Sequence, residues 1–231
     1  VCIRPEIEDC FYNTKFLGLV RDYWKAEYAE PEGMLFNIQG PCPGAGAPHV
    51  DATRFRGMSL DNTPIWLMNT MVKSGLFKRW QARKAQVVTW YYRGSVGGGF
   101  VYWPEGPHAQ PRVLEAPMWG RAAVVENEMM FHTAQTNGPA AMRKPPSLAL
   151  DSMMAADPDV AGGWRITTGG KVIQQIPEGE FRFLVHWGAN VYMNLDELKV
   201  TRDHTDALTH EMAFYILIGD LRARGEQFEM P

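Results

Sequence analysis

The sequence predicts a mainly β fold, a sandwich or barrel of short strands with helices packed outside it near both ends of the chain. Many short segments are rich in β-branched and aromatic residues, and turns containing Gly or Pro separate them at regular intervals. Patterns typical of helices occur near both ends. The chain has 231 residues, 45% of them hydrophobic, which suits one domain that we expect to span residues 1–231.

Three segments carry apolar residues at helical spacing. Residues 14–28 form the first, and residues 62–83 form the second, with an expected break at Ser74-Gly75. The third covers residues 203–224 and is apolar on nearly every side over residues 212–218. We therefore expect this C-terminal helix either to be buried against a sheet or to form a subunit interface, as in a homodimer.

The expected strands are short runs of β-branched or aromatic residues bounded by turn residues. They cover residues 34–39, 86–92, 100–103, 112–115, 122–125, 129–133, 147–150, 164–168, 171–176 and 181–193. Gly169-Gly170 predicts a hairpin between two of them. Residues 151–163 are expected to form a loop.

Composition and charge argue against several classes of partner. The net charge is −3, and no basic block could neutralise phosphates, so we expect no nucleic-acid partner. The chain has neither a Lys/Arg-rich amphipathic helix nor 18 consecutive apolar residues, which predicts no membrane association. Its three cysteines form neither a disulfide framework nor a zinc motif, and this favours a reducing, cytoplasmic environment.

The most informative motif is His49-Val50-Asp51, which is followed much later by His132. Residues i and i+2 of an extended segment point to the same side, so His49 and Asp51 can reach one metal ion. A second imidazole from a neighbouring strand would complete a set of two His and one carboxylate. That set suits non-haem Fe(II) and leaves coordination positions open. A lone His-x-Asp is weak evidence, and we assign a second match, His204-Thr205-Asp206, to a helix start.

A wider pattern surrounds these residues between positions 34 and 150. It comprises Gly98-Gly99-Phe100-Val101-Tyr102-Trp103-Pro104, Pro117, Gly120-Arg121-Ala122-Ala123-Val124-Val125-Glu126-Asn127 and Phe131-His132, in that order. With this pattern the chain resembles the Fe(II)/2-oxoglutarate-dependent oxygenases, in the style of the prolyl-hydroxylase and phytanoyl-hydroxylase branches. The resemblance implies a double-stranded β-helix, a jelly roll similar to that of cupins. It also implies Fe(II) bound by His49, Asp51 and His132, with 2-oxoglutarate and O2 as co-substrates.

The same resemblance implies a basic residue about ten positions after the distal histidine, where it holds the far carboxylate of 2-oxoglutarate. Arg143 is eleven positions after His132. Its planar guanidinium can pair with a carboxylate through two N–H bonds. Arg182, on the predicted strand 181–193, is the rival for this role and could otherwise contact the substrate.

Other residues receive weaker assignments. Asn37 and Gln39 alternate on a predicted strand and could contact 2-oxoglutarate or orient a ligand, although ordinary polar residues of a sheet face would look the same. Arg54 could bind an anionic group of the substrate, with a solvated loop residue as the alternative. Trp90 and Tyr92 share one side of their strand and could line the substrate cavity.

The function that we expect is oxidation of a small molecule, such as an amino acid derivative or specialised metabolite, by hydroxylation, desaturation or ring formation. A cupin-type metalloenzyme that does not use 2-oxoglutarate is one alternative. A non-catalytic jelly-roll binding module is another, because one architecture hosts many functions. His186 is interpreted as a core histidine, and Asn127 is assigned no role.

Overall fold

The structure, a computed structural model, describes residues 4–44, 46–143 and 147–226. It is mainly β, as the sequence predicts, with ten strands in three antiparallel sheets among these residues. The strands are β1 (Tyr28–Gln39), β2 (Arg83–Tyr91), β3 (Phe100–Trp103), β4 (Arg112–Leu114), β5 (Arg121–Val125), β6 (Phe131–Ala134), β7 (Met153–Ala156), β8 (Trp164–Thr168), β9 (Lys171–Ile176) and β10 (Arg182–Tyr192).

The helical elements are short. They are η1 (Pro5–Ile7), α1 (Glu8–Phe11), α2 (Thr14–Trp24), α3 (Ile65–Ser74), η2 (Ala140–Met142), η3 (Glu178–Glu180), α4 (Leu195–Arg202) and α5 (His210–Ala223), where η marks a 3-10 helix. No helix in the described ranges has both the length and the apolar character that crossing a membrane requires.

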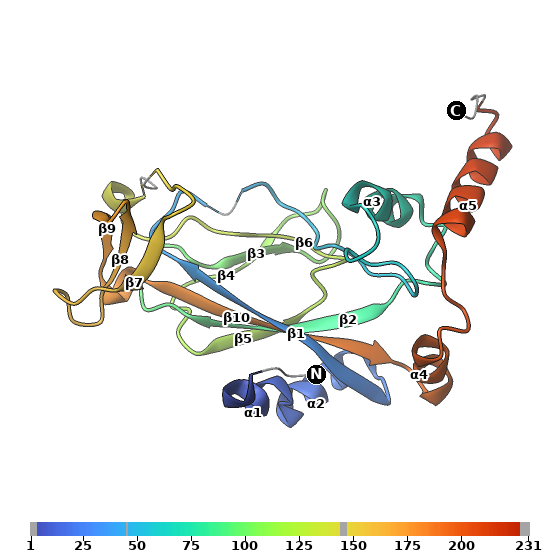
Figure 1. Ribbon diagram of the computed structural model, residues 1–231, viewed down its shortest axis with the longest axis horizontal. Coiled ribbons are helices and arrows are strands. Elements are labelled where there is room, and N and C mark those ends of the chain that lie inside the picture. The colour runs from blue at the N-terminus through green and yellow to red at the C-terminus, as the bar shows by residue number, and fades with distance from the viewer. Residues whose placement is uncertain (1–3, 45, 144–146, 227–231) are drawn as a thin grey trace.

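The largest sheet has the strand order β1-β10-β2-β5, so the last strand of the chain lies in its middle. The pairing of β1 with β10 runs from Tyr28 opposite Tyr192 to Gln39 opposite Arg182. A second sheet, β4-β3-β6, faces the first, and α1 and α2 lie on the far side of the large sheet (Figure 1). The third sheet, β7-β8-β9, lies at one end of the other two.

The alternation of side chains along the strands divides the core between the two faces of the large sheet. On the outer face Val87, Trp187 and Ala189 pack with Val20 of α2, and all four are fully buried. Trp187 also donates a hydrogen bond from Nε1 to the carbonyl oxygen of Phe11, at 2.8 Å. The Trp187 indole therefore connects the N-terminal helices to the sheet through both packing and a hydrogen bond.

On the inner face Val88 and Trp90 of β2 pack with Phe100 of β3 and Val125 of β5. This cluster fills the space between the two sheets. A third cluster lies at the other end of the molecule, where α3 meets the start of α5 and includes the buried residues Phe55 and Leu208. The metal-ligand candidates lie beside the second cluster, since Phe100 also contacts the His132 ring with centroids 5.6 Å apart.

Helix boundaries differ from the sequence prediction where a left-handed residue ends the helix. The helix expected over 14–28 ends at Trp24, because Lys25 has φ 56°, and β1 begins at Tyr28. The helix expected over 62–83 covers only α3. Its predicted break is confirmed, because Gly75 has φ 69° and a residue without Cβ adopts that conformation at little cost.

Two further predictions are wrong. Residues 147–150 form no strand, and β7 lies instead within the expected loop 151–163, where it pairs with β8. The helix expected over 203–224 covers only α5, which begins at His210, and a non-helical segment over 203–209 separates α5 from α4, which ends before the expected range. The turn between them contains His204 at φ 54°, and the Thr209 side chain caps α5 by accepting a hydrogen bond from the Met212 backbone N–H.

The C-terminal helix is not buried against the sheet. It stands beside α3, away from the strands (Figure 1). Ala213 is the one buried residue of α5, whereas Tyr215 is 80% exposed. A homodimer interface on this helix stays a prediction.

The burial of Trp187 predicts a large effect on stability. Trp187→Ala should lower the free energy of unfolding by about 3–5 kcal/mol, because it leaves a cavity and removes a buried hydrogen bond. Trp66→Ala is the matched control, since Trp66 on α3 is 60% exposed, and it should change stability by less than about 0.5 kcal/mol. Urea unfolding followed by circular dichroism measures both; equal losses would contradict the packing described here.

Candidate metal centre

His49 and His132 are brought together by their backbones. His49 lies in the extended segment between β1 and α3, and His132 lies on β6. The two residues form an isolated antiparallel bridge: each backbone N–H donates to the other's carbonyl oxygen, at 3.1 and 2.9 Å. Their imidazole centroids are consequently only 4.6 Å apart.

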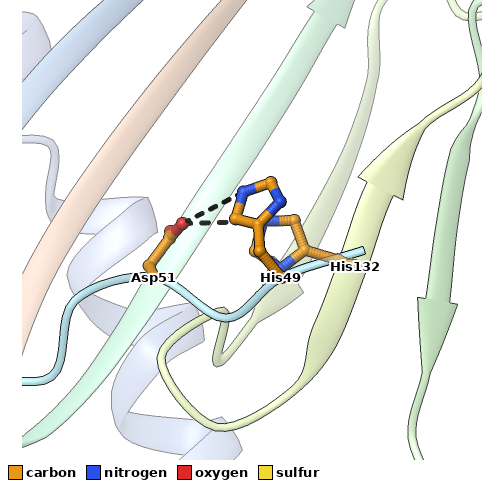
Figure 2. A group of neighbouring side chains, drawn as sticks. All are labelled: His49, Asp51 and His132. Atoms are coloured by element: carbon orange, nitrogen blue, oxygen red, sulfur yellow. Dashed lines mark ion pairs between the residues drawn. The ribbon is translucent and has the colours of Figure 1, made fainter. Parts of the chain in front are cut away.

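Asp51 points its carboxylate toward both imidazoles (Figure 2). Its Oδ1 lies 3.8 Å from Nε2 of His49 and 3.6 Å from Nε2 of His132. One ligand atom from each of the three residues lies within 4.8 Å of the others, so these side chains could hold a metal ion. Bonds of about 2.1 Å at angles of 90–120° separate ligand atoms by about 3.0–3.6 Å, which is close to the distances found here.

The other imidazole nitrogens fix how the rings are oriented. Nδ1 of His49 lies 3.1 Å from the Ala47 carbonyl oxygen, and Nδ1 of His132 lies 3.0 Å from the Met130 carbonyl oxygen. A carbonyl only accepts, so each Nδ1 carries the proton and each Nε2 presents its lone pair toward Asp51. Burial lowers the pKa of His132, which favours the neutral form that a metal ion needs.

Backbone contacts also hold Asp51 in place. Its N–H donates to the Asn127 carbonyl oxygen at 2.8 Å, and the Asn127 N–H in turn donates to Oε1 of Gln86 on β2, at 3.0 Å. The side chains differ in exposure, from 10% for His132 through 32% for Asp51 to 52% for His49. The site is therefore anchored on the β6 side and open on the side of His49.

A cavity of about 190 Å³, here called the arginine cavity, begins at these three residues and extends between β1, β2 and β10. Its lining comprises Leu35, Asn37, Gln39, His49, Asp51, Val88, Trp90, Phe100, Asn127, His132, Thr133, Ala134, Arg182, Leu184 and His186. Arg182 is 2% exposed. Its Nε donates to the Gly98 carbonyl oxygen at 3.0 Å, and its Nη1 to Oε1 of Gln39 at 3.4 Å.

Arg182 has no carboxylate partner among the described residues, and burial lowers its pKa. A buried cation without a counter-ion is costly, so this guanidinium is suited to bind an anion. Two more buried atoms on the same lining, Nε1 of Trp90 and Oδ1 of Asn127, have no hydrogen-bond partner. Unpaired buried polar atoms of this kind are expected where a ligand completes the bonding.

A second cavity, of about 340 Å³, adjoins the first at Asp51, Leu35 and His186. Its lining comprises Glu32, Gly33, Met34, Leu35, Asp51, Ala52, Leu60, Lys84, Ala85, Gln86, Glu128, His186 and Gly188. Lys84 Nζ lies 2.6 Å from Oε2 of Glu32 and 3.1 Å from Oε1 of Glu128. Burial, partly opposed by Lys84, raises the pKa of Glu128 to about 7.

The predicted site residues have different positions in the structure. The three metal ligands lie together, and Asn37, Gln39, Trp90 and Arg182 line the arginine cavity with them. Arg143, Arg54 and Tyr92 do not line that cavity. Arg143 donates from Nε to the Gly138 carbonyl oxygen at 2.8 Å, and Arg54 pairs with Glu32 at 2.7 Å. Tyr92 is fully buried, with its hydroxyl 3.1 Å from Glu180.

Sequence reasoning missed four residues that line the two cavities: His186, Asn127, Lys84 and Glu128. The alternation of side chains along the long strands could have identified two of them. Lys84 points to the same face of β2 as Trp90, and His186 points to the same face of β10 as Arg182. The second His-x-Asp match does not start a helix. Its Asp206 instead accepts hydrogen bonds from Arg56 and Arg79, at 2.8 and 2.9 Å.

Comparisons with known proteins identify no relative. A scan against protein-family models, a search of curated proteins and a search of solved structures each returned no match. The geometry of the site is therefore the evidence for a function.

The metal centre predicts a specific dependence on His132. His132→Ala should weaken binding of Mn(II) or Fe(II) by more than about 100-fold, because it removes the most buried of the three candidate ligands. His108→Ala is the control, as His108 is exposed and distant from the cluster in the chain, and it should bind the metal like the unchanged protein. Calorimetric titration under anaerobic conditions measures both, and unchanged affinity in His132→Ala would rule out this ligand set.

The acidic residues next to the site predict a pH-dependent stability. Burial and then the charge of Glu128 raise the pKa of Glu126 from 4.5 to about 7, against a smaller opposing effect of Arg83. The folded state therefore binds more protons than the unfolded state between these two values, so this group makes stability fall as the pH rises through that window.

Glu126→Gln should remove this loss. Between about pH 5 and about pH 8 the unchanged protein should lose roughly 1 kcal/mol more stability than the variant, a value reduced for the partial exposure of Glu126. The histidines whose pKa is lowered act in the opposite direction but are present in both proteins, so the difference isolates Glu126. Urea unfolding at several pH values measures it, and parallel curves would contradict the assignment.

Proposed function

We propose that the protein is a non-haem Fe(II)- and 2-oxoglutarate-dependent oxygenase that oxidises a small molecule. The observation that carries this proposal is Arg182: a buried guanidinium without a carboxylate partner lines the same cavity as two imidazoles and one carboxylate that could hold a metal ion. Two His and one carboxylate suit Fe(II) with open positions, and a planar guanidinium suits the carboxylate of a co-substrate.

The strand order supports a double-stranded β-helix. Along the chain the segments alternate between the large sheet and the second sheet, in the order β1, His49, β2, β3 and β4, β5, β6, β10. The bridge of His49 with His132 adds a fourth segment to the second sheet, next to β6. Two four-segment layers wound in this way form a jelly roll.

The third sheet accounts for the position of the arginine. Strands β7, β8 and β9 lie between β6 and β10 in the chain, so the sequence distance from His132 to β10 is much longer than in the simplest family pattern. The arginine that binds the co-substrate is then identified by its position in the cavity rather than by its spacing after His132. We therefore assign the far carboxylate of 2-oxoglutarate to Arg182 in place of Arg143.

The residues present fit the co-substrate. Arg182 would hold the far carboxylate at one end of the arginine cavity, with its orientation fixed by the Gly98 carbonyl and by Gln39. Asn37 and the unpaired Nε1 of Trp90 provide further donors on the same lining. The histidines and Asp51 line the same cavity as Arg182, so we expect a dicarboxylate bound at the metal to contact the arginine as well.

Bound Fe(II) and 2-oxoglutarate supply the chemistry, in which O2 is activated, 2-oxoglutarate becomes succinate and CO2, and a C–H bond of the substrate is oxidised. The chain's own residues position and shield this reaction. His49, Asp51 and His132 would hold the ion, and Val88, Phe100 and Leu184 line the cavity beside them with apolar side chains that would exclude water. A cupin-type enzyme without 2-oxoglutarate, or a binding module, would have no use for an unpaired Arg182.

Arg182 and Arg143 provide the test. With Fe(II) bound, Arg182→Gln should weaken 2-oxoglutarate binding about 10–100-fold, because a charged hydrogen bond contributes about 1.5–3 kcal/mol, while the affinity for iron stays unchanged. Arg143→Gln is the matched control and should bind 2-oxoglutarate normally. The anaerobic charge-transfer band of Fe(II) with 2-oxoglutarate measures both.

Each outcome separates the candidates. Loss of the band in Arg143→Gln alone would restore Arg143 as the co-substrate residue. Absence of the band in the unchanged protein with iron bound would favour the cupin-type enzyme. Absence of iron binding as well would favour the non-catalytic module.

A further inference from the structure

The metal-ligand candidates lie where two cavities of opposite character meet. Both cavities are lined by Asp51, Leu35 and His186. The arginine cavity holds one buried cation, Arg182, and its only acidic residue is Asp51. The second cavity holds Glu32 and Glu128 as well as Asp51, against the single cation Lys84. A ligand that reaches the metal from one side therefore meets a different charge from a ligand that reaches it from the other.

The two glutamates of the second cavity share one ammonium group. Lys84 lies between them, and its side chain is 12% exposed, compared with 6% for Glu128 and 21% for Glu32. Glu32 has a second partner in Arg54, but Arg54 does not line this cavity. Within the described ranges Lys84 is the one cation that pairs with Glu128. Burial raises the pKa of Glu128 to about 7, so a second cation beside this cavity-lining carboxyl would favour its charged form and would gain a charged acceptor.

The rest of this lining is mostly apolar. Leu35, Leu60 and Ala52 are apolar residues of this lining. Met34 and Ala85 also border the cavity, but they belong to the cluster around Val20 and Trp187 on the outer face of the large sheet. Together with the glutamates, the two leucines and Ala52 form an aliphatic wall with an anionic end. The volume of about 340 Å³ is in the range of cavities that bind small organic molecules.

We propose that the second cavity binds the molecule to be oxidised, and that this molecule carries a protonated amine on a short aliphatic chain. Glu128 and Glu32 receive the ammonium group, and the aliphatic chain lies against Leu35 and Leu60 toward the ion at Asp51. This proposal rests on the proposed function, since it takes the arginine cavity as the site of the co-substrate. An anionic substrate is disfavoured, because it would face two carboxylates with one lysine already shared between them.

Three probes of equal chain length test the charge preference: pentylamine, pentanoate and pentan-1-ol. The protein is loaded with Mn(II) and saturated with 2-oxoglutarate, so that the arginine cavity is filled. Enhanced proton relaxation of a probe by the paramagnetic ion then reports binding close to the metal. We expect strong relaxation for pentylamine, with an affinity about tenfold or more above those of the two other probes.

Variants locate the site. Glu128→Gln should lower the affinity for pentylamine about tenfold or more without weakening Mn(II) binding, and Glu32→Gln provides a second variant if the buried substitution prevents folding. Glu178→Gln is the matched control, because Glu178 pairs with Arg93 outside both cavities and should bind pentylamine normally. Equal relaxation of all three probes, or no effect of either cavity variant, would overturn the proposal.

The same probes separate this inference from the proposed function. Saturation-transfer NMR on the metal-free protein detects pentylamine whether or not a metal or 2-oxoglutarate binds. If Mn(II) fails to bind but pentylamine still binds in a Glu128-dependent way, the cation site stands and the oxygenase proposal fails. If Mn(II) and 2-oxoglutarate bind but pentylamine does not, the oxygenase proposal stands and the cation site fails.

Discussion

The candidate site depends on one backbone interaction, the pair of hydrogen bonds between His49 and His132. His49 lies outside every named strand, in a segment that follows a loop rich in Pro and Gly, and the contact of its Nδ1 with the Ala47 carbonyl oxygen orients the ring only within that segment. The bridge ties the segment to the edge of the second sheet. Because Asp51 follows two residues later and is anchored at Asn127, the same segment delivers both an imidazole and the carboxylate.

Strand β10 is the second constraint, because one of its faces contributes side chains to the hydrophobic core and the other contributes side chains to the cavity lining. Trp187 and Ala189 face α2 and are fully buried. Arg182 and His186, which are in phase with each other, line the cavities. Since β10 pairs with β1 and β2 over most of its length, a shift of one residue would expose the tryptophan and withdraw the arginine together. Stability of the sheet and placement of the anion-binding group are therefore coupled.

The electrostatics of the site follow from how these elements meet. Asp51 lies at the junction of a cavity with one unpaired cation and a cavity with two carboxylates for one cation. Such a junction can bring an anion and a cation to one metal ion from separate sides, so that neither competes for the other's position. Lys84 pairs with both Glu32 and Glu128 and so has little capacity left for another anion, while Arg54 pairs with Glu32 from outside the cavity lining.

Sequence alone determined the mainly β class, most strands and the pairing of His49 with Asp51, because strand alternation and His-x-Asp spacing are local properties, and the family resemblance added His132 as the third candidate ligand. Tertiary structure decided which arginine faces the cavity. Arg143 is nearer to His132 in sequence, but it bonds to the Gly138 carbonyl, whereas Arg182 arrives through pairing of β10 with β1. Tertiary structure also decided that residues 153–156 form strand β7 and that His186, Lys84 and Glu128 line the cavities. Long-range strand pairing sets which side chains share a cavity, and no local sequence pattern encodes that pairing.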